Sequence, residues 1–256
     1  MEEHSLLNMI SGYSDEPAKL MQIDEHYRYE DLLMESVMWP DPEKCREALR
    51  GLEQTYYRNV FPPRFPNDPV SEYRESTLRL NTVLRIAARR GGLPPVFLHA
   101  ISDGFAFRIY RMRTVGELEP FREYMAHYYV NAVSEYSINR YSDEVGEIIS
   151  YINYHLLDKI SLSELAQQFH FSESYLSRRF KRETGFNLSS FVVRSRVELA
   201  KQYFRMGYKS VTQVSQLCGF SDSGYFQKVF KKIEGETPSK FIAGICRDGN
   251  EVLNTP

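Results

Sequence analysis

Residues 161–191 read SLSELAQQFHFSESYLSRRFKRETGFNLSSF, and residues 210–241 read SVTQVSQLCGFSDSGYFQKVFKKIEGETPSKF. The second stretch repeats the first at an offset of 49 residues as far as Ser172 and Ser221, and at an offset of 50 residues after them. The aligned residues include Tyr175 with Tyr225, Phe180 with Phe230, Gly185 with Gly235, and Phe191 with Phe241. A repeat of this length predicts two copies of one supersecondary unit.

The first copy has the pattern of a short helix, a turn and a second helix. Ser161 and Glu164 are spaced as a capping box at the start of the short helix. Ser172 is placed to cap the second helix, which Gly185 is expected to end by adopting a left-handed conformation. We therefore predict a helix-turn-helix unit at about residues 161–184.

The second copy repeats this pattern at about residues 210–233. Ser210 and Gln213 form the corresponding capping box, and Gly219 begins the turn. Residues 188–206 contain no helix breaker, so one long helix is expected to link the two units. After the second unit, Thr237-Pro238 predicts the start of a final helix.

The second helix of each copy separates a packed face from a polar outer face. The expected packed residues are Leu176 and Phe180 in the first copy, and Tyr225, Phe226, Val229 and Phe230 in the second. The outer faces carry Ser174, Ser177, Arg178, Lys181 and Arg182 in the first copy, and Ser223, Gly224, Gln227, Lys228, Lys231 and Lys232 in the second. Basic residues on the outer face of both copies favour DNA binding over bare structural duplication, because two such helices can enter successive major grooves about 34 Å apart.

The net charge of −2 is unevenly distributed along the chain. Residues 146–247 hold 15 Lys and Arg against 9 Asp and Glu, whereas residues 1–145 hold 17 against 23. The basic excess coincides with the repeat, as binding to phosphates requires. Basic helical domains that only present a solvated face show a similar excess, so the charge supports DNA binding only together with the repeat.

The repeat resembles the DNA-binding domain of the AraC/XylS family of bacterial transcription regulators. The resemblance covers about residues 145–243 and rests on LSELAQQFHFSESYLSRRFKRETGFNLSSFVVRSRVELAKQYF and on VSQLCGFSDSGYFQKVFKKIEGETPSKFI. It implies two helix-turn-helix units that bind double-stranded promoter DNA in the cytoplasm, with RNA polymerase as a further partner. Activation is the expected outcome, and repression is the alternative.

The resemblance also implies roles for the outer-face residues. The expected base-reading residues are Ser174, Ser177, Arg178, Ser223, Gly224, Gln227 and Lys228, and the expected phosphate contacts are Lys181, Arg182, Lys231 and Lys232. Arg178 suits a guanine and Gln227 an adenine, while the alternative for Arg178 and Lys228 is a phosphate contact alone. Because Ser174 and Gly224 are small, DNA shape is expected to contribute to recognition. Arg194 and Arg196 on the linking helix are expected to form surface salt bridges.

The fold is predicted to be mainly α, with a helical regulatory domain at residues 1–138 and the DNA-binding domain at residues 143–247. Helical spacing over residues 74–90 and a capping box formed by Thr114 and Glu117 support helices in the first domain. Three short segments interrupt this pattern: FPPRFPNDP from Phe61 reads as a loop, residues 136–142 as a linker, and residues 105–110 leave room for a strand. The pattern does not resemble a cupin barrel.

Control by an effector is inferred from the family plan. The aromatic residues that are candidates to line a pocket for a small molecule or peptide are Tyr56, Tyr57, Phe97, Phe105, Phe107, Tyr110, Tyr124, Tyr128 and Tyr129, although their spacing also fits an ordinary core. His99 and His127 are expected to be packed or surface residues rather than ligands. A homodimer is the other expected use of this domain.

Several function classes are not indicated. Cys45, Cys218 and Cys246 have neither disulfide nor zinc spacing, so reduced and mostly buried thiols are expected. No phosphate loop, nucleophile elbow or dinucleotide glycine pattern occurs, so neither catalysis nor a cofactor or metal is expected. Neither a long apolar run nor a signal peptide is found, so no membrane contact is expected. A response regulator would need strands that alternate with helices in residues 1–145, and this pattern is not found there. An interaction module that has lost DNA binding is a further alternative, and the basic outer faces argue against it.

Overall fold

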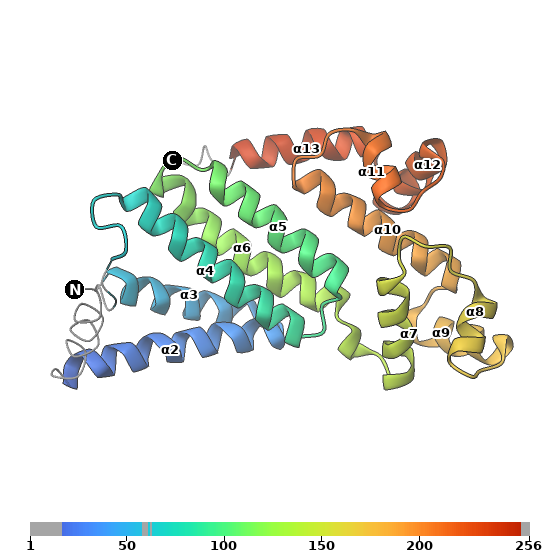
Figure 1. Cartoon of the computed structure of the whole chain (residues 1–256), viewed down its shortest axis with the longest axis horizontal. Coiled ribbons are helices and arrows are strands. Elements are labelled where there is room, and N and C mark those ends of the chain that lie inside the picture. The colour runs from blue at the N-terminus through green and yellow to red at the C-terminus, as the bar shows by residue number, and fades with distance from the viewer. Residues whose placement is uncertain (1–16, 58–60, 62, 252–256) are drawn as a thin grey trace, which may run out of the picture. The chain divides into compact units, whose positions relative to one another are not determined.

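The computed structural model describes residues 17–57, 61 and 63–251, and in this part of the chain all regular structure is helical (Figure 1). The elements are α2 (Pro17–Met38), α3 (Pro42–Tyr57), α4 (Pro69–Arg90), α5 (Pro95–Arg111), α6 (Val115–Tyr136), η1 (Ile138–Arg140), α7 (Asp143–Tyr154), α8 (Leu162–Gln168), α9 (Glu173–Thr184), α10 (Leu188–Arg205), α11 (Val211–Leu217), α12 (Ser223–Glu234) and α13 (Pro238–Glu251). The prediction of a mainly α fold without a cupin barrel is confirmed.

The chain divides into two compact units. Unit 1 comprises the described residues up to Ala88 together with Arg113–Ser134, and unit 2 comprises Arg89–Met112 together with the described residues from Glu135 onward. Because α5 belongs to unit 2 although α4 before it and α6 after it lie mainly in unit 1, segments of the two units alternate along the sequence. The domain boundaries at residues 138 and 143 remain a prediction.

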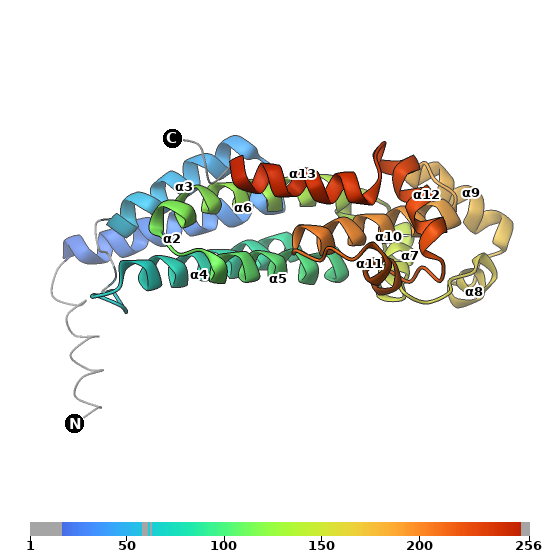
Figure 2. The ribbon, with the colours of Figure 1, turned by 90° about the horizontal axis from the view of Figure 1, so that it is seen from above.

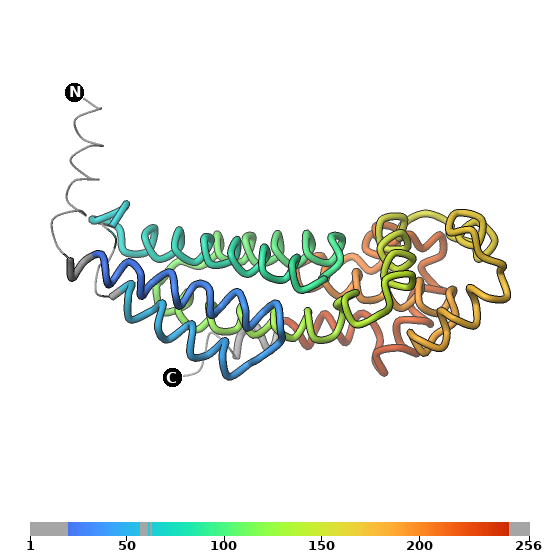
Figure 3. Tube along the Cα trace, turned by 90° about the horizontal axis from the view of Figure 1, so that it is seen from below, coloured from blue at the N-terminus to red at the C-terminus, as the bar shows by residue number. Residues whose placement is uncertain are grey.

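Unit 1 contains the hairpin of α2 and α3, which lie side by side as the neighbouring blue traces of Figure 3. The turn between them is stabilised by Asp41, whose carboxylate accepts hydrogen bonds from the backbone N–H groups of Glu43 (3.1 Å) and Lys44 (3.0 Å). Pro42 occupies the first helical position, where its missing N–H has no consequence. The hairpin therefore forms from local turn chemistry.

The core of unit 1 joins α4 to α6 by two polar contacts as well as by apolar packing. The buried Tyr129 hydroxyl donates to Asn81 Oδ1 at 2.8 Å, and Arg122 Nη1 donates to Ser76 Oγ at 2.8 Å. The capping box of Thr114 and Glu117 at the start of α6 is confirmed, because each backbone N–H bonds to the other side chain. Leu84, Phe121 and Met125 are fully buried between these contacts, as expected of an ordinary helical core.

The expectation of a strand at residues 105–110 was wrong, because they lie within α5. Phe97, Ile101, Phe105 and Ile109 recur every four residues and are all buried. A stripe with helical period over the whole element outweighs a short alternating run, and Pro94-Pro95 favours a helix start at this point. α5 packs against α10 within unit 2 (Figure 2).

The predicted loop between α3 and α4 is confirmed in its described part, whereas the role of residues 136–142 as a linker between domains remains a prediction. The described residues between α3 and α4 are not helical, while Pro62 lies outside the described residues. The expected linker at residues 136–142 contains the last residue of α6 and the short helix η1. Hydrogen bonds hold this segment in place, because Ser137 Oγ donates to the carbonyl of Gly91 (2.6 Å) and Ile138 N–H to that of Gly92 (2.9 Å).

Burial raises the pKa of the Cys45 thiol to about 11 and that of Cys218 to about 12, so both are protonated at neutral pH. Both are free and buried, as predicted, and the side chain of Cys246 lies outside the description. Within the described residues, no group of three or more His, Cys, Asp or Glu side chains is arranged to hold a metal ion. None of the described helices has the length and apolarity that crossing a bilayer requires.

Candidate nucleic-acid interface

The first helix-turn-helix unit consists of α8 and α9, drawn in yellow in Figure 1. Ser161 Oγ accepts a hydrogen bond from Glu164 N–H (3.2 Å), and the Glu164 carboxylate accepts one from Ser161 N–H (3.0 Å). These bonds lower the pKa of Glu164, first through the Ser161 hydroxyl and then through the backbone N–H. Ser172 caps α9 and Gly185 ends it with φ 78°, as the sequence predicts.

The second unit consists of α11 and α12, drawn in red in Figure 1. Ser210 Oγ accepts a hydrogen bond from Gln213 N–H at 3.3 Å, and Gly235 ends α12 with φ 80°. The N-cap of α12 is Asp222, whose carboxylate accepts from Tyr225 N–H. The N-caps Ser172 and Asp222 are 50 residues apart, so the extra residue of the second unit precedes its N-cap.

The turns of the two units share an unusual backbone conformation. His170 has φ 57°, and the aligned Gly219 has φ 75°. A Cβ on Gly219 would lie 2.9 Å from the carbonyl oxygen of Leu157 and 3.0 Å from its Cα. Gly219 is therefore required both by its dihedral angle and by the close approach of the backbone of Leu157.

We expect Gly219→Ala to lower the free energy of unfolding by about 2–3 kcal/mol, because left-handed backbone strain and the contact with Leu157 act together. His170→Ala is the matched control, because His170 already carries a Cβ at a positive φ. We expect this control to change stability by less than about 0.5 kcal/mol in urea denaturation. Equal losses in the two variants would contradict the importance of the Leu157 contact.

The packed face of each second helix is formed by two residues four positions apart. Leu176 and Phe180 are 2% exposed, and Phe226 and Phe230 are fully buried. The prediction that Tyr225 packs inward was wrong, because its side chain is 52% exposed. Tyr225 lies one residue before Phe226, so it is rotated about 100° around the helix from the buried position.

Two exposed tyrosines were therefore missed by the sequence prediction of the outer faces. Tyr175 is 38% exposed, and the aligned Tyr225 is more exposed still. Each stands in the first turn of its helix and contacts one aromatic ring of the preceding turn: Tyr175 lies 5.1 Å from Phe171, and Tyr225 lies 6.3 Å from Phe220. The signal available in the sequence was their identity at aligned positions.

The residues of the predicted DNA-binding surface lie on the outer faces of α9 and α12. Exposed among them are Ser174, Arg178, Lys181, Arg182, Gly224, Gln227, Lys228, Lys231 and Lys232, and half-buried are Ser177 and Ser223. The Nε atom of Arg178 donates to the carbonyl of Ser174 at 3.1 Å. This bond uses only one nitrogen, so the fork of the guanidinium can still bind a base edge or a phosphate. The Ser223 hydroxyl is shielded from solvent and has no hydrogen-bond partner.

Comparison with known proteins identifies this part of the chain. A family profile described as a helix-turn-helix domain matches residues 165–244. These residues are a helix-turn-helix domain of the AraC type. The match begins within α8 and includes the whole of α9, α10, α11 and α12.

Three relatives of the AraC-type domain differ in how much of their length is matched. A probable transcriptional regulator, LumQ of Photobacterium leiognathi, is 36% identical over 94 residues, which are 37% of this chain and 38% of the relative. An uncharacterized regulator of the helix-turn-helix type from Staphylococcus aureus is 32% identical over 99 residues, which are 39% of this chain and 13% of the relative. The solved C-terminal domain of the two-component response regulator yesN from Fusobacterium nucleatum is 27% identical, with 40% of this chain and 99% of that domain covered and a TM-score of 0.37. The chain thus matches well under half the length of both curated relatives.

Within the AraC-type domain, Arg179 anchors α9 rather than serving the outer face. Its guanidinium lies 2.6 Å from Glu183 and 3.4 Å from Glu144, and Glu183 also accepts a hydrogen bond from the Ser142 hydroxyl (2.8 Å). Burial opposes ionisation of Glu183, but the bonds from Ser142 and the charge of Arg179 hold the pKa of Glu183 below its usual value. The second helix of the first unit, α9, is therefore tied to the beginning of α7.

The predicted linking helix is confirmed as α10, which Asn187 caps and the left-handed Gly207 follows. On this helix the buried Glu198 pairs with Lys201 at 2.7 Å, and Lys201 also reaches Glu234 of α12 at 3.1 Å. Burial opposes the charge of Lys201, but both carboxylates stabilise it and raise its pKa. The ion pair therefore connects the linking helix α10 to α12.

The prediction of surface salt bridges for Arg194 and Arg196 was wrong for Arg196. All three of its hydrogen bonds go to backbone carbonyl oxygens. Arg194 lies over the ring of Phe186 at 4.5 Å. Sequence spacing alone indicates neither the carbonyl oxygens that bind Arg196 nor the ring that lies against Arg194, because all of these groups come from turns outside α10.

The residues considered for an effector pocket are distributed over both units. Phe97, Phe105 and Tyr129 are buried in cores, whereas Phe107 and Tyr110 are exposed. His99 and His127 each lie near a carboxylate one helical turn away, Asp103 at 3.3 Å and Glu123 at 3.6 Å. The side chain of Tyr57 lies outside the description.

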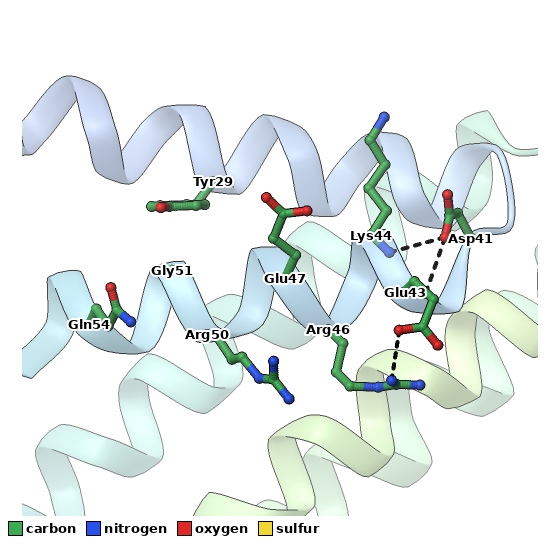
Figure 4. Close-up of a pocket in the computed structure, with 9 residues that line it drawn as sticks. All are labelled: Tyr29, Asp41, Glu43, Lys44, Arg46, Glu47, Arg50, Gly51 and Gln54. Atoms are coloured by element: carbon green, nitrogen blue, oxygen red, sulfur yellow. Dashed lines mark hydrogen bonds and ion pairs between the residues drawn. The ribbon is translucent and has the colours of Figure 1, made fainter.

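A hollow of about 640 Å³ in unit 1 is lined instead by Tyr29 of α2, Asp41 of the turn and mostly charged residues of α3 (Figure 4). Tyr29 lies over Gly51 at one end of this hollow, and at the other end Arg46 pairs with Glu43 at 2.8 Å. Lys44 pairs with Glu35 at 2.8 Å. Acidic and basic side chains thus line the hollow together.

Proposed function

We propose that the chain is a sequence-specific transcription regulator that binds double-stranded promoter DNA through its AraC-type domain. The observation that carries the proposal is the pair of aligned helices, α9 and α12, each with a buried apolar face and an exposed basic face. Two such helices suit insertion into successive major grooves. The proposal assigns no catalytic activity, and the curated relatives, which are described as transcriptional regulators, support this.

In this proposal the outer-face residues divide into two groups. Arg178 presents a guanidinium fork for a guanine, and Gln227 presents an amide for an adenine. The remaining base-reading candidates are Ser174, Ser177, Ser223, Gly224 and Lys228. Lys181, Arg182, Lys231 and Lys232 lie in the last turns of the two helices and are assigned to phosphates. We add Tyr175 and Tyr225 as exposed rings beside the DNA.

The proposed regulation acts on α10. Three contacts in unit 2 support it: α5 packs against α10, the side chain of Met206 fills the space over Gly104, and the Tyr136 hydroxyl hydrogen-bonds Glu198. Burial and the Glu198 charge both raise the pKa of Tyr136, so the hydroxyl keeps its proton. A small-molecule or peptide effector or a homodimer contact that shifts α5 would then act on the linking helix.

The outcome of DNA binding is proposed to be activation by recruitment of RNA polymerase, with repression by occlusion as the alternative. Because bacterial promoter DNA lies in the cytoplasm, this function places the protein there. The sign of regulation is measured by transcription in vitro from a promoter that carries the selected site, with and without the protein.

DNA binding is tested by selecting duplexes from a random library with the full chain. Fluorescence anisotropy then compares the enriched duplex with a scrambled duplex of the same composition across a salt series. We expect the enriched duplex to bind more tightly and both affinities to fall steeply with salt. Failure to enrich any sequence, with equal binding to an acidic polymer, would contradict the proposed function.

Base reading is tested by Arg178→Ala and Lys228→Ala. We expect each variant to lose about 1–3 kcal/mol of discrimination between the enriched and scrambled duplexes, because each removes a base contact. Arg85→Ala is the control, because Arg85 is exposed on α4 and belongs to unit 1. If an Arg178 or Lys228 variant binds both duplexes more weakly by the same factor, that residue contacts phosphate only.

A further inference from the structure

Arg196 lies in the middle of α10, and its guanidinium joins two turns that are far apart in the sequence. Its Nε donates to the carbonyl oxygen of Leu156 at 2.8 Å, and Nη2 donates to that of Asp158 at 2.6 Å. Its Nη1 donates to the carbonyl oxygen of Gly219 at 2.6 Å. Each of the three nitrogens therefore has a backbone oxygen as its partner.

One turn leads into the first helix-turn-helix unit, and the other lies within the second unit. Leu156 and Asp158 lie between α7 and α8, immediately before the first unit, and Gly219 lies between α11 and α12. The guanidinium is planar and carries its N–H donors in fixed directions, so three simultaneous bonds fix both turns against α10. An ammonium carries its three donors on a single nitrogen, so it does not reproduce the three separate donor positions of the guanidinium.

Packing around the guanidinium agrees with a rigid junction. The Phe220 ring is buried and lies 5.9 Å from Arg196 Cζ. A Cβ on Gly219 would stand 3.1 Å from the same carbon atom and 2.9 Å from the carbonyl oxygen of Leu157. The backbones of the two turns thus touch at the point where Arg196 holds them.

We propose that Arg196 is a positioning residue that fixes the separation and relative rotation of α9 and α12, and with them the spacing between the two half-sites in DNA. The proposal rests on the function proposed above. In the folded protein Arg196 touches no base: it acts through the two turns, so each recognition helix keeps its own outer face when the residue is replaced. What is lost is the fixed separation and rotation of α9 and α12. In wild type this fixed relation lets the second helix bind its half-site intramolecularly only when the two half-sites have one particular spacing.

The test is a second selection from the same random duplex library with full-length Arg196→Ala. Wild type is expected to enrich two half-sites at one spacing, preferred by about tenfold over spacings longer or shorter by one base pair. The variant is expected to enrich the same two half-sites, with the preference for that spacing reduced to about twofold. Anisotropy on duplexes with one base pair inserted or removed between the half-sites provides the same comparison as affinities.

Arg194→Ala is the matched control, because Arg194 is an exposed arginine on the same helix and lies over the ring of Phe186. It is expected to keep the wild-type spacing. Arg196→Lys retains the charge without the fork and is expected to behave like the alanine variant. If Arg196→Ala does not fold, as judged by circular dichroism, Arg196→Lys decides by the same criteria.

The outcomes separate the two proposals. A wild-type protein that enriches no sequence contradicts the proposed function itself. A wild type that enriches two half-sites, beside a folded Arg196 variant with the same narrow spacing, overturns the positioning role alone. A folded variant that loses one or both half-sites also overturns it, because Arg196 would then act on an individual helix rather than on the relation between them.

Discussion

Phe230→Ala is expected to lower the free energy of unfolding of unit 2 by about 3–5 kcal/mol, the usual cost of removing a buried aromatic ring. Phe230 is fully buried on α12. Its ring lies 5.6 Å from Phe226, 5.6 Å from Phe241 and 5.9 Å from Phe204, so it joins α12 to both α13 and α10. The alanine variant leaves a cavity that these rings cannot fill without moving their helices.

The loss is measured by urea denaturation followed by circular dichroism, together with hydrogen exchange of peptides from α12 and from α2. Exchange is needed because two compact units need not unfold in one transition. Protection is expected to fall in α12 and to remain unchanged in α2.

Tyr225→Ala is the matched control for this prediction. It removes an aromatic ring of similar size from the same helix, but from its exposed side. We expect a change within about 0.5 kcal/mol, as is usual for surface substitutions. A loss as large as that of Phe230→Ala would mean that the helix uses both faces for packing and has no free surface for DNA.

The parts of the fold that follow local rules could be predicted from the sequence. The capping box of Ser161 and Glu164, the left-handed Gly185 and the uninterrupted α10 each depend on residues close together in the chain. The repeat predicted the second unit as well, because the aligned residues of the two copies follow the same local rules. Even there, one extra residue in the turn moved the N-cap of α12 to Asp222. The residue that caps a helix therefore depends on the geometry of the turn before it.

The parts that depend on distant contacts could not be predicted. Arg196 looks like any basic residue on a helix, and its partners are backbone carbonyls that no side-chain pattern reveals. The same holds for α5, because nothing in its apolar stripe indicates that it packs against α10. Tyr225 is exposed although it directly precedes the buried Phe226, because one residue turns the helix by about 100°.

The replacement of Lys181, Arg182, Lys231 and Lys232 together by alanine is expected to have the largest effect on DNA binding. Each cation that neutralises a phosphate contributes about 0.9 to the slope of log affinity against log salt concentration, so the four together account for about 3.6. All four side chains are exposed, and they lie in the last turns of α9 and α12. We therefore expect weaker binding at low salt and a much shallower salt dependence, with similar losses on enriched and scrambled duplexes.

This effect must be distinguished from a general change in net charge and from a loss of helix stability. A quadruple variant with alanine at Arg28, Arg50, Arg85 and Arg113 removes the same charge from exposed positions of unit 1 and is expected to keep most of the slope. Circular dichroism checks the last turns of α9 and α12, where each lost cation costs about 0.3–1 kcal/mol of interaction with the helix dipole. If both quadruple variants lose the same slope while folded, DNA is attracted by the overall charge of the protein. If only the first does, the last turns of α9 and α12 lie against the phosphates, as the proposed insertion into two grooves requires.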